Sequence, residues 1–240
     1  MSEFLVVVPT VRRHLPGFEE TMAHIQSTFT RPTEFHILDG RGGKVPALNR
    51  ALRELVIPGE HAYYATIDDD SLPTPGWQDA AVSAFASDLR LGIISPWLGD
   101  DDWSLDVMGR DSVGPWESLG DQMIRRLKPW RHVPGGLLVF RRACVLAIGP
   151  QPETGLGYEI YEDAWRGRVA YREGWLSAYT KQGTPLRFFD YQDDPAYLAQ
   201  KEKDIAASRA RQDAVFAEAG VRDPLMWRLR RFVARLRGRG

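Results

Sequence analysis

Three consecutive carboxylates, Asp68, Asp69 and Asp70, follow an apolar stretch, "AYYATI" at 62–67. Like charges 4 Å apart repel by about 4 kcal/mol at an effective dielectric near 20, so such a cluster favours a bound cation. Successive side chains of an extended chain point to opposite faces, which puts Asp68 and Asp70 together and Asp69 on the other side. This D-x-D pair suits Mg²⁺ or Mn²⁺, whose remaining ligands are phosphate oxygens and water. The alternative is a solvated turn before "LPTPG".

A second pair of acids, Glu162 and Asp163, lies in "GLGYEIYEDAWRG", where two glycines introduce a predicted helix within 155–175. A carboxylate at this place can act as a general base. Carboxylates in a first helical turn also interact favourably with the helix dipole, so a structural cap is the alternative.

A glycine-rich turn precedes Lys44 in "DGRGGKVPALNRAL" at 39–52. Backbone N–H groups and one cation ahead of a helix can bind phosphate. The segment is not a Walker A loop, because Gly40 and Lys44 are too close and Val45 stands where Ser or Thr is required. The glycines alone could simply form a turn.

The composition fits one α/β domain with a small appendage: 240 residues, of which 43% are apolar and 26% charged. A net charge of -1 gives no overall basic field, so nucleic acid is not the expected partner. The single Cys144 excludes an internal disulfide, and the apolar run at 4–8 is too short for a signal peptide or membrane span. We therefore expect a cytoplasmic protein.

Strand and helix patterns alternate along the first part of the chain. Continuous apolar runs predict strands at 4–8, 34–39, 62–67 and 91–95, and helical spacing predicts helices at 16–29, 45–55 and 77–87. This order predicts an open, mostly parallel sheet flanked by helices. Ligands of such sheets bind beyond the carboxyl ends of the strands, where Asp39 and the Asp68–Asp70 triplet would lie.

The alternation stops at 97–132, a segment that contains Trp97, Trp103, Trp116 and Trp130. We interpret it as an insertion over the site. Its aromatic faces could contact an acceptor sugar, although for any one of the four tryptophans packing against the domain is the interpretation that we prefer. A strand and a helix return at 135–149, and a long charged helix is predicted at 195–220.

These motifs, in this order, resemble family 2 glycosyltransferases of the GT-A type. The resemblance covers residues 4–180 and rests on "VVVPT", Asp39, "KVPALNRAL", the D-x-D followed by "PTPGW", "GGLLVFRR", and "YED" followed by "REGW". It implies a Rossmann-like GT-A domain at 1–195 and C-terminal helices at 196–240. It also implies a metal-dependent transfer from a nucleotide-diphosphate sugar, with UDP as the expected nucleotide, to a hydroxyl of a saccharide, a lipid-linked molecule or another acceptor.

The resemblance also implies roles for individual residues. Asp163 would be the general base of an inverting transfer, with Glu162 beside it. Asp70, together with Asp68, would bind the metal. The implied nucleotide-binding residues are Pro9, Thr10, Asp39, Gly40, Lys44, Asn49, Asp68 and Asp69. The implied acceptor-binding residues are Trp97, Trp103, Trp116, Gly135 and Gly136. The unit between Asp39 and the "ALN" helix is shorter than in the family.

Two other functions remain open. "IDDDS" also resembles the Asp-x-Asp motif of haloacid-dehalogenase phosphatases, although two predicted strands precede it here instead of none. A non-catalytic protein that binds sugar nucleotides is the second alternative.

The last segment, 224–240, predicts a basic amphipathic helix with an apolar stripe through Leu225, Leu229, Phe232 and Leu236. Such a helix can lie on an anionic membrane surface. The stripe could equally pack on the domain or on a second copy of the chain in a homodimer.

Overall fold

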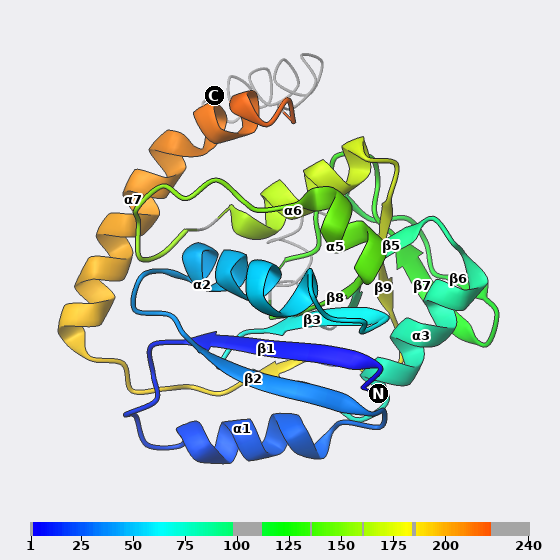
Figure 1. The fold of residues 1–240 in the computed structure, drawn as a ribbon, viewed down its shortest axis with the longest axis horizontal. Helices are drawn as coiled ribbons and strands as arrows, with labels where there is room; N and C mark the ends of the chain where they lie inside the picture. The colour runs from blue at the N-terminus through cyan, green and yellow to red at the C-terminus, as the bar shows by residue number, and fades with distance from the viewer. Residues whose placement is uncertain (1, 98–111, 135, 160, 184–185, 222–240) are drawn as a thin grey trace, which may run out of the picture.

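The computed structural model describes residues 2–97, 112–134, 136–159, 161–183 and 186–221 (Figure 1). Its strands are β1 (Phe4–Thr10), β2 (Thr33–Asp39), β3 (Tyr63–Ile67), β4 (Ser71–Leu72), β5 (Leu91–Pro96), β6 (Glu117–Leu119), β7 (Gln122–Arg126), β8 (Leu137–Arg141), β9 (Leu176–Thr180) and β10 (Arg187–Phe188). Its helices are α1 (Phe18–Ser27), α2 (Lys44–Ala51), the π-helical turn η1 (Leu52–Val56), α3 (Trp77–Ser87), α5 (Arg142–Ile148), α6 (Glu162–Arg172) and α7 (Pro195–Glu218).

The main sheet has eight strands in the order β2-β1-β3-β8-β5-β9-β7-β6, and β4 pairs with β10 in a small second sheet. Strands β7 and β8 run opposite to the others. The predicted α/β fold with a mostly parallel sheet is therefore confirmed. The insertion of β8 between β3 and β5 is a feature that the strand patterns did not predict.

The helices cover both faces of the sheet, and the alternation of side chains along β1 shows how. Leu5 and Val7 belong to the apolar cluster that includes residues of α2, α5 and α6. Phe4, Val6 and Val8 belong to the cluster on the other face, with residues of α1 and α3. Because both faces of β1 are covered, its sequence is a continuous apolar run rather than an alternating one.

The ends of the parallel strands define the edge at which the site forms. β1 pairs with both β2 and β3, and Thr10 lies opposite Asp39 in the register. The first residues after β3 are the three aspartates. The chain therefore delivers the ends of β1, β2 and β3 to one edge of the sheet, as expected.

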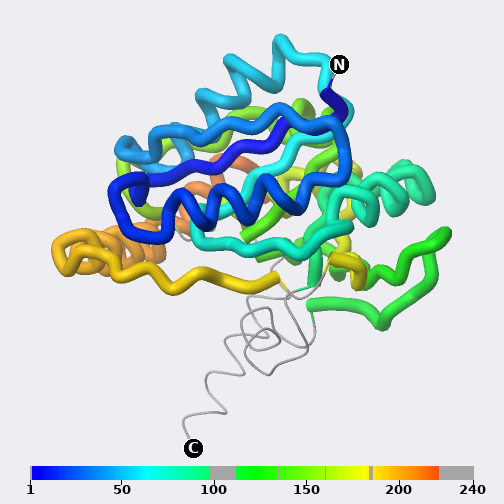
Figure 2. The backbone as a smooth tube through the Cα atoms, turned by 90° about the horizontal axis from the view of Figure 1, so that it is seen from below, coloured from blue at the N-terminus to red at the C-terminus, as the bar shows by residue number. Residues whose placement is uncertain are grey.

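The long helix α7 lies beside this edge of the sheet and runs from the lower left of the view toward the region above α6 (Figure 1), and Figure 2 shows the same helix from below. Asp194 caps its first turn by accepting a hydrogen bond from the Ala196 N–H at 2.6 Å, and Pro195 occupies the first helical position. Near its other end, Phe216 packs edge-on against Tyr161, with ring centres 6.0 Å apart. The helix predicted at 195–220 is confirmed, and the basic helix predicted at 224–240 lies outside the described residues.

Within the described ranges, no helix has both the length and the hydropathy that crossing a bilayer requires.

Candidate active site

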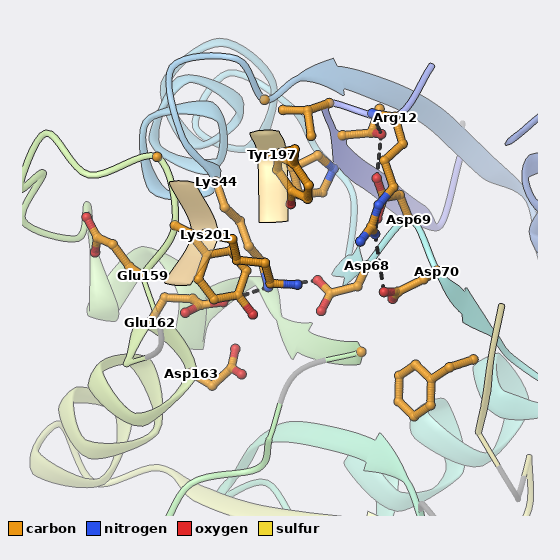
Figure 3. A pocket seen from close by; sticks show the side chains of 18 residues that line it. Arg12, Lys44, Asp68, Asp69, Asp70, Glu159, Glu162, Asp163, Tyr197 and Lys201 are labelled. Carbon is orange, nitrogen blue, oxygen red and sulfur yellow. Dashed lines mark hydrogen bonds and ion pairs between the residues drawn. The ribbon is translucent and has the colours of Figure 1, made fainter. Parts of the chain in front are cut away.

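A cavity of about 310 Å³ lies at the carboxyl edge of the sheet (Figure 3). Its walls come from the ends of β1 and β3, the start of α2, the segment before α6, the first turn of α6, β10 and the first turns of α7. The lining residues are Pro9, Thr10, Val11, Arg12, Gly40, Lys44, Asp68, Asp69, Asp70, Gly136, Gly157, Tyr158, Glu159, Glu162, Asp163, Phe188, Tyr197 and Lys201.

The three aspartates have different surroundings. Asp69 is buried and accepts hydrogen bonds from Thr10 Oγ1 at 2.5 Å and Arg12 Nη1 at 2.7 Å. Asp70 is partly exposed, and its Oδ2 lies 3.3 Å from Arg12 Nη1. Burial raises the pKa of Asp70 to about 6, and the like charges of Asp68 and Asp69 contribute to the rise. Asp69 is thus bound within the protein, whereas Asp70 is a carboxylate that a cation would stabilise.

Lys44 joins the aspartate triplet to α6. Its Nζ lies 2.7 Å from Asp68 Oδ1 and 2.7 Å from Glu162 Oε1. Burial alone would lower the pKa of Lys44, but Asp68, Glu162 and Asp163 together raise it well above its usual value. The ammonium therefore stays charged and holds two acids from distant parts of the sequence at fixed positions.

Asp163 lies on the first turn of α6, one residue from the acid that Lys44 binds. The side chain is half-buried. Burial, and then the negative charge of Glu162, raise the pKa of Asp163 to about 7. A carboxylate with this pKa can accept a proton near neutral pH, which is the property that a general base requires.

Arg12 binds acids from two parts of the chain. Besides Asp69 and Asp70, it pairs with Asp193 through Nε–Oδ1 at 2.8 Å and Nη2–Oδ2 at 2.7 Å. Its guanidinium also lies over the rings of Tyr191 and Tyr197, 5.1 and 5.8 Å from their centres. Both side chains of the Arg12–Asp193 pair are at least nine-tenths buried, so the pair fixes the segment that leads into α7 against the end of β1.

The structure brings together most of the residues expected at the site. Those that line the cavity are Pro9, Thr10, Gly40, Lys44, Asp68, Asp69, Asp70, Gly136, Glu162 and Asp163.

Two residues expected near the nucleotide lie outside the cavity lining. Asp39 ends β2 beside Thr10, but its exposed side chain pairs with Arg41 at 2.6 Å, which lowers the pKa of Asp39. Asn49 is buried in α2, where it donates to the Gln151 carbonyl and accepts from the Gln151 N–H. Asn49 therefore anchors the loop after α5 in this structure.

The tryptophans expected over the acceptor are placed differently from the expectation. Trp97 is 3% exposed and packs edge-on against Tyr179 and Trp116, with ring centres 4.9 and 5.8 Å away. Neither Trp97 nor Trp116 lines the cavity. The described part of the segment 97–132 instead adds the β6–β7 hairpin to the sheet beside β9. Trp103 and Gly135 lie outside the described residues.

Several cavity residues were not anticipated from the sequence: Arg12, Tyr158, Phe188, Tyr197 and Lys201. Arg12 had a usable signal, because it follows the predicted first strand at 4–8 by four residues and so belongs at the same sheet edge. Tyr197 and Lys201 had none, because their approach depends on where α7 packs.

No group of three or more Asp, Glu, His or Cys side chains is arranged around a potential metal position within the described ranges. A cation held by Asp70 would therefore need further ligands from substrate or water, which is common for Mg²⁺. Burial and the charges of Asp68 and Asp69 outweigh the effect of Arg12 and raise the pKa of Asp70, which fits this kind of site.

No family model and no curated protein sequence matches this chain. The chain does match solved structures. A mannosyltransferase from Pyrobaculum calidifontis in complex with GDP-Man and Mn²⁺ aligns with 93% of this chain at 18% identity and a TM-score of 0.62, and the alignment covers 65% of the mannosyltransferase chain.

Glucosyl-3-phosphoglycerate synthase from Mycobacterium tuberculosis also matches. Its complex with Mn²⁺, UDP and phosphoglyceric acid aligns with 92% of this chain and 80% of its own, at 14% identity and a TM-score of 0.53. Its complex with Mg²⁺ and UDP aligns with 92% of this chain and 81% of its own, at 11% identity and a TM-score of 0.52. This chain therefore has the GT-A fold that its motifs predicted.

Proposed function

We propose that the protein is a glycosyltransferase that moves a sugar from a nucleotide-diphosphate donor to an acceptor hydroxyl. One observation carries the proposal. The aspartate triplet after β3 and the Glu162–Asp163 pair on α6 face the same cavity, and Lys44 connects them through Asp68 and Glu162. The solved structures with this fold include transferases that hold GDP-Man or UDP together with Mn²⁺, which supports the same class of donor here.

On the donor side, Asp70 and Asp68 would hold Mn²⁺ or Mg²⁺, which supplies positive charge to the leaving diphosphate when it is bound. Asp69 keeps this end of β3 in place through Thr10 and Arg12. The backbone at Pro9 and Thr10, together with Gly40, borders the cavity and is available to the nucleotide. Gly40 is suited to this position because a Cβ there would lie 3.0 Å from the Thr10 carbonyl oxygen.

On the acceptor side, Asp163 would take the proton of the attacking hydroxyl. Its pKa of about 7 makes it a competent base at neutral pH, and general base catalysis contributes typically about 10² to 10⁴ in rate. Attack from the side opposite the diphosphate would invert the anomeric centre. Gly136 lines the cavity, where its backbone would border the acceptor; glycine is required at this position because its φ is +104° and a Cβ would lie 2.8 Å from Leu186 Cδ2.

The test is release of nucleoside diphosphate from UDP- and GDP-sugars, with Mn²⁺ or with EDTA, across a panel of saccharide and lipid-linked acceptors. The proposal predicts release that requires both the metal and an acceptor and is lost in Asp163→Asn. Turnover that persists in EDTA, or that is unchanged in Asp163→Asn, would contradict the proposed mechanism. A parallel assay with p-nitrophenyl phosphate tests the phosphatase alternative, for which we expect no activity.

A further inference from the structure

Among the described residues, three cationic side chains line the cavity: Arg12, Lys44 and Lys201. Arg12 is engaged by Asp69, Asp70 and Asp193, and Lys44 by Asp68 and Glu162. Lys201 differs from both, because it forms no ion pair with a carboxylate in the described part of the chain. Its Nζ instead lies 4.7 Å from the centre of the Tyr158 ring.

The position of Lys201 is fixed by contacts on either side of it along α7. Before it, Asp193 is held by the two-point pair with Arg12, and Asp194 caps the helix. One turn after it, Asp204 accepts hydrogen bonds from the Tyr158 N–H at 3.1 Å and from Gln200 Nε2 at 2.9 Å. The helix that carries Lys201 is therefore hydrogen-bonded to the segment that carries the Tyr158 ring.

Asp193 is a carboxylate that Lys201 affects electrostatically. The pKa of Asp193 is lowered chiefly by its hydrogen bond with Arg12, and Lys201 adds a smaller electrostatic effect. Each oxygen of Asp193 accepts one hydrogen bond from Arg12, and no ion pair joins Asp193 to Lys201 in the described part of the chain. The ammonium thus keeps its capacity to donate hydrogen bonds into the cavity, close to Tyr158 and the start of α6 (Figure 3).

We infer that Lys201 binds an anionic group, a phosphate or a carboxylate, on one of the two substrates. This inference rests on the proposed function. The remaining walls carry Asp68, Asp70, Glu162 and Asp163, which would repel an anion that arrived without compensating charge. A lysine without a carboxylate partner is the group that can offset this repulsion, since charge-assisted hydrogen bonds to phosphate are among the stronger ones in proteins. The anion would belong to the donor diphosphate or to an acidic acceptor.

Binding of UDP and GDP in the presence of Mn²⁺, measured by titration calorimetry, tests the donor source. The variants are Lys201→Met, which removes the charge and keeps the length, and Lys201→Arg, which keeps the charge. Lys203→Met is the matched control, because Lys203 is exposed on the same helix and does not line the cavity. For a donor anion, Lys201→Met should weaken binding about tenfold or more, whereas Lys201→Arg and Lys203→Met should stay within about twofold of the wild type. The corresponding nucleosides, which lack phosphate, should bind all four proteins equally.

Inorganic phosphate, titrated into protein already saturated with nucleoside diphosphate and Mn²⁺, tests the acceptor source. If nucleotide binding is unchanged in Lys201→Met but phosphate binding is weakened about tenfold or more, the anion belongs to the acceptor. If Lys201→Met changes neither, the inference is wrong. If the wild type binds no nucleoside diphosphate, the proposed function fails instead, and phosphate titration with Mn²⁺ alone still reports whether Lys201 binds an anion.

Discussion

Arg12 and Asp193 form a two-point ion pair across 181 positions of sequence, with both nitrogen–oxygen distances at or below 2.8 Å. The pair joins the end of β1 to the entrance of α7. Through it, a helix at the end of the described chain becomes a wall of the cavity that the first half of the sequence builds.

Asp193→Asn should lower the stability of the protein. The substitution leaves the buried Arg12 without its bidentate partner, and breaking a buried pair in this way costs about 3 to 5 kcal/mol. The measurement is the free energy of unfolding from urea titration. Asp190→Asn is the control, because Asp190 is exposed and contributes to no described ion pair. An equal loss of stability in both variants would contradict the role given to the pair.

Asn49→Ala should also destabilise the protein, while leaving nucleotide affinity unchanged. Asn49 exchanges two hydrogen bonds with the backbone of Gln151, and its loss leaves buried polar groups without a partner at a cost of about 1 to 3 kcal/mol. Urea unfolding and calorimetry with UDP or GDP measure the two effects separately. A selective loss of nucleotide affinity at unchanged stability would favour the nucleotide-binding role that the family resemblance implies for Asn49.

Asp163→Asn should abolish transfer but leave nucleotide and Mn²⁺ affinity nearly intact, because the amide keeps the shape and cannot accept the proton. The expected fall in kcat is about 10² to 10⁴. The control is Glu173→Gln at the other end of α6, an exposed acid paired with Arg172. Loss of nucleotide binding in Asp163→Asn would mean that the residue holds the donor and is not the base.

The metal-free protein should become more stable as the pH falls from 7.5 to 5.5. The pKa values of Asp70 and Asp163 are raised in the folded state to about 6 and about 7, whereas an unfolded aspartate has a pKa near 3.9. Folding therefore takes up protons in this window, and the stabilising effect of these groups is lost as the pH rises through 6 and 7. We expect a change of about 1 to 3 kcal/mol.

Unfolding in EDTA at several pH values measures this dependence. The double variant Asp70→Asn, Asp163→Asn should flatten the profile in this window and raise the stability at pH 7.5. An unchanged profile in the double variant would show that other groups, such as the histidines, cause the dependence.

The sequence predicted the parts of the fold that depend on local patterns. The continuous apolar run at 4–8 and the acids after "AYYATI" located β1, β3 and the metal-side carboxylates, because both signals are contained in a few adjacent residues. The position of β8 between β3 and β5 depends on pairing across at least 70 positions with β3 and at least 45 with β5, for which one sequence gives no signal.

For the site as for the fold, the sequence predicted the residues that belong to local motifs and missed those that long-range packing brings to the cavity. Asp163 and Lys44 were identified because each belongs to a recognisable motif, and both line the cavity. Tyr197 and Lys201 could not be predicted, because α7 reaches the cavity through the long-range Arg12–Asp193 pair. The tryptophans of 97–132 left two interpretations open, sugar contacts and packing against the domain, and for Trp97 the structure shows packing in the core.

The central claim is that Asp70 binds a divalent cation together with a nucleoside diphosphate. The most direct test is the thermal shift of wild type and Asp70→Ala with UDP, GDP, CDP or dTDP, each with and without Mn²⁺. A ligand at 100 times its Kd stabilises a protein by about 2.7 kcal/mol, which is readily resolved. We predict that one diphosphate stabilises the wild type only with Mn²⁺ and leaves Asp70→Ala unchanged. Equal stabilisation of both proteins, or stabilisation by none of the four nucleotides, would contradict the claim.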